Sequence, residues 1–320
     1  MKIIRTLSRR ELSKCFLTFG LAVPTVVATT DWRSAVAAPP SDVAAGGPKR
    51  TVKFHDGLVV PALGQGSARL GQGRHPEAAE EQALREGIEL GMILIDTAEI
   101  YGSGNAERLI GRVIADQRDH VFIVSKVWPT HVPGSGIQEA CEGSLSRLGI
   151  SYLDLYLLHW PNGITDFSGV MAAFEQLRKN GKIRAWGVSN FGVSEMDRLF
   201  TVPSGDRCAI NQVPYNLTDR SNETALLPWC ERHDLPIMAY SPLGGPGSTL
   251  LRNSTLARIA SAHGCSAAAI ALSWTIRSGK IIAIPESGSA AHVTENAVAL
   301  SLDLTPEDLQ ALDAAYPASR

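Results

Sequence analysis

The sequence carries almost no excess charge of either sign. Its 320 residues include 30 Lys and Arg against 32 Asp and Glu, which gives a net charge of −2 at pH 7. A surface that binds nucleic acid or an anionic membrane needs an excess of positive charge, so neither role is indicated. The composition, 44% hydrophobic and 19% charged, is that of an ordinary globular protein.

Cysteine is scarce and follows no metal-binding pattern. The five cysteines are Cys15, Cys141, Cys208, Cys230 and Cys265, and no two of them have C-x-x-C spacing. We interpret the last four as small buried hydrophobic residues, although spacing alone leaves a disulfide open. No H-E-x-x-H pattern or carboxylate cluster is present, so we expect no metal site, and a metal-dependent hydrolase is disfavoured.

Phosphate-binding loops of the common nucleotide enzymes are also missing. The first turn after a predicted strand, Gly64–Arg69, does not complete G-x-G-x-x-G, and no P-loop occurs. Strands that alternate with helices fit either a doubly wound open sheet or a barrel. The missing fingerprint favours the barrel.

No apolar run near the N-terminus is long enough to cross a membrane. The apolar stretch Cys15–Ala28 contains Pro24 and falls short of the roughly 20 residues that a spanning helix needs. A twin arginine, Arg9-Arg10, precedes this stretch, and Ala35-Val36-Ala37 follows it. Charge, apolar run and A-x-A cleavage site therefore occur in the order of an export signal.

This region resembles a twin-arginine signal peptide, which sends folded proteins across the bacterial inner membrane. We predict a signal peptide at 1–37, a flexible linker at 38–50 and one barrel domain at 51–320. The protein would be cytoplasmic before export and periplasmic or exported after cleavage near Ala38. Its partner would be the twin-arginine export machinery, and it would have no stable membrane anchor. An uncleaved amphipathic tail is the alternative.

Periodic apolar segments predict a single (β/α)8 TIM barrel with an N-terminal β-hairpin plug and a C-terminal helix. The hairpin is expected at Thr51–Val60, with Asp56-Gly57 in its turn. The eight predicted strands are Ala62–Gly66, Met92–Asp96, Val121–Lys126, Leu153–His159, Ile183–Asn190, Cys208–Gln212, Ile237–Tyr240 and Ile281–Pro285.

Several helices between these strands have clear ends. Val170–Asn180 carries an apolar stripe and stops before Gly181, a residue typical of a helix C-terminus. A further helix is expected at Asn222–His233. Thr305 followed by Pro306 predicts the N-cap and first residue of the terminal helix.

Ionisable residues end three successive predicted strands. Lys126 follows Asp96 by 30 residues and His159 follows Lys126 by 33, and about 30 residues is the length of one βα repeat. Tyr101 stands in the turn after Asp96. Since the carboxyl ends of barrel strands hold active sites, these four side chains are expected to meet there. Singly, each is as easily a packed aromatic, a solvated lysine or a core histidine.

At these residues the sequence resembles the aldo-keto reductase family, over about Lys49 to Pro317. Seven motifs in order carry the resemblance, and within the family it is most similar to short bacterial reductases acting on methylglyoxal and diketo-gluconate-type carbonyls. The motifs are Ile95–Ala98 with Tyr101-Gly102, Val124–Val127, Leu157–Pro161, Gly187–Phe191, Asn211–Val213, Tyr240–Leu243, and Ile284-Pro285 with Glu295-Asn296.

The resemblance implies an oxidoreductase, acting as a monomer, that transfers a hydride from NAD(P)H to small aldehydes or ketones. The implied catalytic residues are Asp96, Tyr101, Lys126 and His159. Tyr101 would donate the proton, Lys126 would lower its pKa from about 10, and neutral His159 would orient the carbonyl. The alternative is a cofactor-binding, redox-sensing regulatory subunit with little turnover.

Cofactor positions also follow from the resemblance. Ser189, Asn190 and Gln212 would hold the nicotinamide carboxamide, and Tyr240 would stack on the ring. The remaining implied contacts are Ser241 and Leu243 at the pyrophosphate loop, Pro285, Glu286, Ser287 and His292 near the ribose phosphate, and Glu295 and Asn296 at the adenine.

Two of these positions depart from the family pattern. The family usually has Lys where Glu286 stands and Arg where His292 stands, and both cations pair with the 2′-phosphate of NADP. Glu286 would repel this phosphate or accept from a ribose hydroxyl. A Glu286 turned to solvent would leave the phosphate to its neighbours. The expected cofactor is NADP(H), and this change favours relaxed or NAD-shifted use, with NAD(H) as the second cofactor.

Substrate contacts are expected from Trp128, His159 and Trp160, with His131 nearby. The chain stops soon after its last predicted helix, whereas larger family members add a long C-terminal loop that narrows the pocket. The resemblance therefore implies an open site for small or varied carbonyl compounds.

Overall fold

A computed structural model describes residues 50–245 and 247–318. The predicted signal peptide at 1–37 and all but the last residue of the predicted linker lie outside the described residues. In the described part of the chain, no helix is long and apolar enough to cross a membrane. No group of three or more His, Cys, Asp or Glu residues that could hold a metal ion is found there either.

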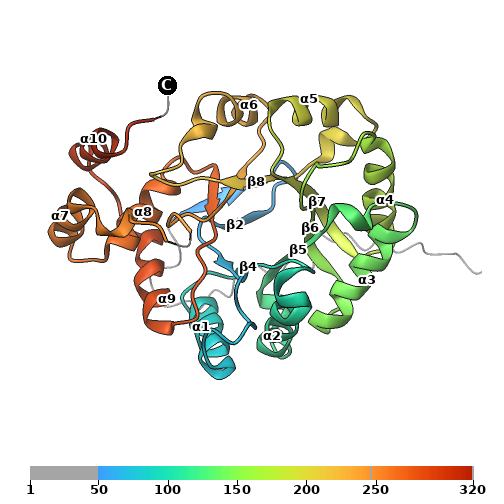
Figure 1. Ribbon diagram of the computed structural model, residues 1–320, viewed down its shortest axis with the longest axis horizontal. Coiled ribbons are helices and arrows are strands. Elements are labelled where there is room, and N and C mark those ends of the chain that lie inside the picture. The colour runs from blue at the N-terminus through green and yellow to red at the C-terminus, as the bar shows by residue number, and fades with distance from the viewer. Residues whose placement is uncertain (1–49, 246, 319–320) are drawn as a thin grey trace, which may run out of the picture. The chain divides into compact units, whose positions relative to one another are not determined.

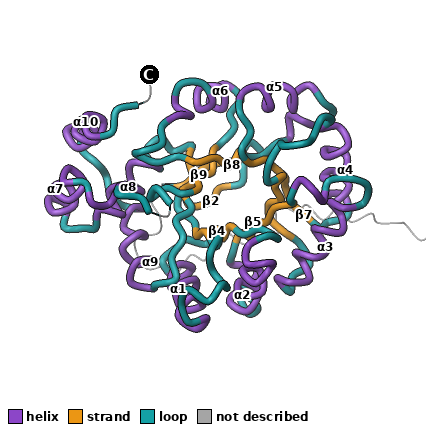
Figure 2. Tube along the Cα trace, in the orientation of Figure 1, coloured by secondary structure: helices purple, strands orange, loops and turns teal. Residues whose placement is uncertain are grey.

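Eight parallel strands form the centre of the domain and follow one another in chain order (Figures 1 and 2). Isolated parallel bridges from Leu63 to Ala283 and from Gly66 to Glu286 join the first strand to the last. The predicted (β/α)8 barrel is therefore confirmed. The strands are β3 Gln65–Gly66, β4 Leu94–Asp96, β5 Phe122–Val127, β6 Leu153–Leu158, β7 Ile183–Ser189, β8 Asn211–Pro214, β9 Ile237–Tyr240 and β10 Ile281–Ala283.

These strands are buried on both faces, as their apolar sequences require. In β5 and β6 every residue is buried, including Lys126. One apolar cluster fills the space between the barrel and its helices, and a second fills the barrel interior. A charged side chain inside such a barrel is costly unless it is paired, so Lys126 needs an anionic partner.

Helices surround the strands (Figure 2). Their bounds are α1 Glu77–Glu89, α2 Asn105–Ile114, α3 Gly136–Leu148, α4 Phe167–Lys179, α5 Val193–Thr201, α6 Leu226–Arg232, α7 Ser254–His263, α8 Ala267–Thr275, α9 Ala290–Ala297 and α10 Pro306–Ala315. The helix ends follow local chemistry. Gly181 adopts a left-handed φ of 70° just after α4, and Thr305 accepts a hydrogen bond from the Asp308 amide at the start of α10.

The helix expected at Asn222–His233 is shorter than predicted. The chain forms a 3-10 turn at Ser221–Glu223, and α6 begins only at Leu226. Pro228 is the physical reason, because proline lacks the amide hydrogen and is tolerated only in the first turn of a helix. A helix running unbroken from Asn222 would place Pro228 in its interior.

The predicted hairpin closes the N-terminal end of the barrel. Strand β1 (Thr51–Lys53) pairs antiparallel with β2 (Val59–Pro61). Gly57 occupies the turn with a left-handed φ of 91°. Phe54 is buried and its ring lies 6.1 Å from that of Phe122, the first residue of β5. The opposite end, where the strands finish, is left for the site.

Candidate active site

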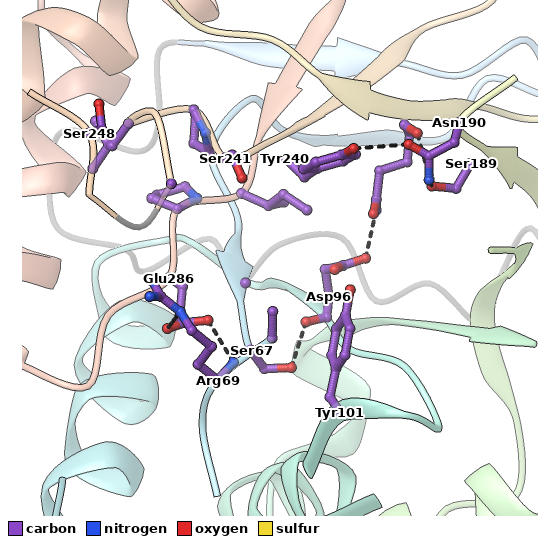
Figure 3. A pocket seen from close by; sticks show the side chains of 18 of the residues that line it. Ser67, Arg69, Asp96, Tyr101, Ser189, Asn190, Tyr240, Ser241, Ser248 and Glu286 are labelled. Atoms are coloured by element: carbon purple, nitrogen blue, oxygen red, sulfur yellow. Dashed lines mark hydrogen bonds and ion pairs between the residues drawn. The ribbon is translucent and has the colours of Figure 1, made fainter. Parts of the chain in front are cut away.

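A cavity of about 690 Å³ opens at the carboxyl ends of the barrel strands. This volume is in the range of small-molecule and cofactor pockets. The lining side chains come from the first, second, fourth, fifth, sixth, seventh and eighth strand ends and their loops (Figure 3). They include Asp96, Tyr101, His159, Trp160, Ser189, Asn190, Gln212, Tyr240, Ser241, Leu243, Pro285 and Glu286.

The structure brings Asp96, Lys126 and Tyr101 together at the base of this cavity. The Lys126 Nζ lies 2.7 Å from Asp96 Oδ2, 2.7 Å from the Thr97 carbonyl oxygen and 3.3 Å from the Tyr101 hydroxyl. Asp96 Oδ1 also accepts a hydrogen bond of 2.7 Å from the Gln212 amide nitrogen. The ammonium therefore has an anionic partner and sits within reach of the phenol.

The Lys126 ammonium remains charged in this buried place. Burial alone lowers the pKa of Lys126, but Asp96 and Tyr101 more than offset that effect, so the pKa lies above its ordinary value. The side chain of Lys126 is fully buried. Its three hydrogen bonds hold the ammonium in one position next to the phenol, since a fully satisfied buried polar network restricts its members.

The pKa of Tyr101 is raised, not lowered. Burial is the largest effect, and it outweighs the lowering by the Lys126 ammonium. The expectation that Lys126 would bring the phenol below its usual pKa is therefore wrong in its net direction, although the ammonium does act in that sense. The hydroxyl consequently carries its proton at neutral pH.

His159 follows β6 and is held between two aromatic rings. Its ring lies 5.8 Å from that of Tyr101 and 5.1 Å from that of Trp128, both in edge-to-face geometry. Burial, aided by the Lys126 charge, lowers the pKa of His159 to about 3. The imidazole is therefore neutral near pH 7, as the sequence analysis expected for a hydrogen-bond donor to a carbonyl oxygen.

A second set of polar side chains, Ser189, Asn190 and Tyr240, also lines the cavity. The Tyr240 hydroxyl donates to Asn190 Oδ1 at 2.9 Å, and the Asn190 amide donates to the His159 carbonyl oxygen at 3.0 Å. Asn190 has a left-handed φ of 63°, a backbone conformation that asparagine tolerates better than most residues. Ser189 donates to the Gln212 carbonyl oxygen at 2.9 Å. These bonds fix the side chains before any ligand arrives.

Glu286 does not face the cavity as a free carboxylate. Its Oε2 accepts from the Arg69 backbone amide at 2.7 Å. Its Oε1 lies 3.2 Å from Arg69 Nε and 3.6 Å from an Arg74 guanidinium nitrogen. Neither arginine was predicted as a site residue from the sequence. Both arginines lie in the loop after the first barrel strand. This position could have indicated a role at the site, because the loops after the strands of a barrel border its active site.

Other expected residues lie outside the cavity lining. Trp128 packs on His159 from the side, and exposed His131 bonds to Glu99. Ser287 donates to the Ser289 carbonyl oxygen. His292, Glu295 and Asn296 all belong to α9. The lining also has members that were not predicted as individual site residues: Gly66, Ser67, Ala68, Arg69, Pro242, Gly245, Gly247, Ser248, Leu251, Arg252 and Ile284.

Glu99 ties two loops at the mouth of the site. One of its carboxylate oxygens accepts from the Trp128 backbone amide at 2.6 Å and lies 2.9 Å from His131 Nδ1. The loop after β4, which carries Tyr101, is thereby fastened to the loop after β5. Trp128 is the residue in that second loop that contacts His159.

Comparison with known sequences gives consistent matches over this domain. A family profile described as the aldo/keto reductase family matches residues 62–317. Methylglyoxal reductase YeaE of Escherichia coli is 45% identical over 275 residues, which cover 85% of this chain and 96% of the relative. Glyoxal reductase of Bacillus subtilis is 35% identical over 266 residues, covering 83% and 92%.

Solved structures agree with the sequence matches. An aldo/keto reductase from Klebsiella pneumoniae, crystallised with NADP and acetate, superposes with a TM-score of 0.82 at 43% identity. The match covers 85% of this chain and 96% of that one. A second structure from the same organism, in complex with NADPH, has a TM-score of 0.81 at 43% identity.

Proposed function

The chain belongs to the aldo/keto reductase family, and from this premise we propose that it reduces small α-dicarbonyl compounds, such as methylglyoxal and glyoxal, with NADPH. It is an NAD(P)H-dependent carbonyl reductase that converts aldehydes or ketones to alcohols. The substrate class is supported by a methylglyoxal reductase at 45% identity and a glyoxal reductase at 35% identity.

The cavity fits a nicotinamide cofactor. It has polar side chains fixed by hydrogen bonds near Tyr101, namely Ser189, Asn190 and Tyr240, and arginine side chains elsewhere along its length. A pocket with a few placed polar groups and cationic residues suits a ligand with one amide-bearing ring and several phosphates. The bound reduced cofactor supplies the hydride, and this chain supplies orientation and the proton.

We assign the proton to Tyr101 because its hydroxyl lies in the cavity and is protonated near neutral pH. As negative charge develops on the carbonyl oxygen, the phenol proton moves to that oxygen. The Lys126 ammonium, 3.3 Å away, stabilises the phenolate that remains, and Asp96 keeps the ammonium in place. Neutral His159 donates a hydrogen bond that orients the substrate carbonyl.

The pairing of Lys126 with both Asp96 and Tyr101 at the floor of a cavity is the observation that carries this proposal. The test is consumption of reduced coenzyme by the purified protein with a panel of methylglyoxal, glyoxal and simple aliphatic and aromatic aldehydes. We expect the highest kcat/KM with the two dicarbonyls. Higher efficiency with the simple aldehydes throughout would reject the dicarbonyl assignment while leaving the reductase intact.

We also propose that the enzyme is exported by the twin-arginine route. The support is the order of Arg9-Arg10, the apolar stretch and Ala35-Val36-Ala37 ahead of the family match, which starts at residue 62. Replacing Arg9 and Arg10 by Lys keeps the positive charge and should hold the protein in the cytoplasm. Fractionation and N-terminal sequencing measure this, with mature protein expected to start near Ala38. Undiminished export of the double variant contradicts the proposal.

A further inference from the structure

A compact ion-pair cluster joins the first and last loops of the barrel beside the cavity. Its centre is the Glu286 carboxylate, whose side chain is only 15% exposed. The Arg69 backbone amide donates to it at 2.7 Å, and the Arg69 and Arg74 guanidinium groups lie at 3.2 Å and 3.6 Å. The two arginine side chains are 39% and 47% exposed. Each guanidinium group thus pairs with Glu286, while much of each arginine side chain remains accessible to a ligand.

The charges of this cluster decide what it can bind. One carboxylate and two guanidinium groups sum to +1. A lone glutamate here would repel a phosphate, whereas this cluster as a whole attracts one. The two arginines therefore more than offset the negative charge that Glu286 contributes. Guanidinium groups also present several N–H donors in a plane that matches phosphate oxygens.

The place of the cluster in the cavity indicates which phosphate it meets. Figure 3 shows Arg69 and Glu286 on one side of the cavity and Ser189 and Asn190 on the other. For hydride transfer the nicotinamide ring has to lie beside Tyr101. An extended dinucleotide held in this way would place its adenosine end toward the other end of the cavity. Among the described residues that line it, the cationic side chains are Arg69 and Arg252.

We propose that Arg69 and Arg74, positioned by Glu286, recognise the 2′-phosphate of NADPH and set the preference for NADPH over NADH. The inference rests on the proposed reductase function. It reverses what Glu286 suggests in isolation, because the carboxylate acts as an anchor for two cations. The competing arrangement is a Glu286 that accepts a ribose hydroxyl and favours NADH.

Binding of nucleotide fragments tests this independently of turnover. Adenosine 2′,5′-bisphosphate and adenosine 5′-monophosphate differ only in the 2′-phosphate, and calorimetric titration gives the ratio of their Kd values. We expect the wild-type protein to prefer the bisphosphate. The variant R69Q/R74Q should lose at least roughly tenfold of that preference, the effect of removing one charge-assisted hydrogen bond. Its affinity for the monophosphate should change much less.

The matched control is R85Q. Arg85 lies on α1, is 40% exposed and pairs with Asp116 at 3.6 Å, so it resembles Arg74 in exposure but does not pair with Glu286. Its Kd ratio should equal that of the wild type. The single variant R74Q, at the more exposed of the two arginines, should lose part of the preference for the bisphosphate. It provides the test if the double variant folds poorly.

The outcomes separate the inference from the reductase function. A wild-type protein that binds both fragments equally, or prefers NADH in kcat/KM, overturns the inference while leaving carbonyl reduction in place. An unchanged ratio in both R74Q and R69Q/R74Q overturns it as well. A protein that binds the bisphosphate through these arginines but reduces no carbonyl compound would instead refute the proposed function.

Discussion

Tyr101 combines two effects that act on its proton in opposite directions. Burial holds the proton on the hydroxyl, and the nearby Lys126 ammonium favours its departure. A proton donor for a carbonyl needs both, because the proton must be present before the reaction and must leave during it. The two requirements are met by one contact of 3.3 Å in an otherwise buried setting.

Tyr101→Phe removes the hydroxyl and little else. General acid catalysis is typically worth about 10²- to 10⁴-fold, so we expect kcat for carbonyl reduction to fall by a factor in this range. Coenzyme binding, followed by fluorescence titration, should change only slightly because the ring remains. A variant that keeps more than about a tenth of the wild-type kcat would exclude Tyr101 as the donor.

His159 makes a second prediction at this scale, one about pH. Its pKa is lowered to about 3, so the imidazole is already neutral well below pH 6 and stays neutral as the pH rises. The kcat/KM profile for reduction should therefore show no break near pH 6.5, the usual histidine value. A break near that pH that disappears in His159→Gln would mean that the imidazole titrates there.

At the scale of elements, loops that follow adjacent strands are fastened to each other. Glu99 joins the loop after β4 to the loop after β5 through Trp128 and His131. Glu286 joins the loop after β3 to the segment after β10 through Arg69. The first contact holds Trp128 against His159 and the second holds Arg69, and both His159 and Arg69 line the cavity. Strand ends therefore fix the floor of the site, and loop contacts fix its rim.

Glu99→Ala should loosen the rim without disturbing the floor. Losing the hydrogen bond to the Trp128 amide frees that loop, so we expect KM for the carbonyl substrate to rise several-fold while kcat changes less. Glu81→Ala is a suitable control, because Glu81 forms an exposed ion pair with Arg112 on the outer helices. If both variants showed the same fall in kcat and the same rise in KM, the cause would be a general structural change and not the loss of the Glu99 contacts.

The parts of the fold that could be predicted are those set by short-range chemistry. Apolar runs gave the eight strands, and Gly181 and Thr305 gave helix ends, because these signals act within a few residues. The break before α6 was missed since the effect of Pro228 depends on where the helix starts. Arg69 and Arg74 were missed for a different reason: they lie 217 and 212 residues before Glu286, and no local pattern reports such a contact.

At the scale of the whole molecule, the thiols report on how tightly the barrel is packed. Cys141, Cys208 and Cys230 are buried free thiols, and burial raises the pKa of each to about 12. Cys265 is partly exposed, and burial raises its pKa as well. The thiolate is the reactive form of cysteine. Burial should therefore protect Cys141, Cys208 and Cys230 in two ways, because it keeps reagents away from the thiol and keeps the thiol protonated.

Among the cysteines of the described domain, a chromophoric disulfide reagent should therefore modify Cys265 first in the native protein, and reach Cys141, Cys208 and Cys230 only on global unfolding. Mass spectrometry of peptides identifies the modified residue. Denaturant should release the three slow thiols together, at the midpoint recorded by circular dichroism. Fast native labelling of Cys141, Cys208 or Cys230 would mean that the helical layer opens locally.

The bridges from Leu63 to Ala283 and from Gly66 to Glu286 have a consequence for biosynthesis. After the ribosome has translated the first barrel strand, it must translate more than two hundred further codons before the last strand, which closes the barrel, can pair with it. Until then, every nascent chain exposes two unpaired strand edges. A chain truncated before β10 has Asp96, Tyr101, Lys126 and His159 but no closed ring to hold them. Completion of the ring is therefore a late step in folding. Under the proposed twin-arginine route, which carries folded proteins, export would follow the end of translation.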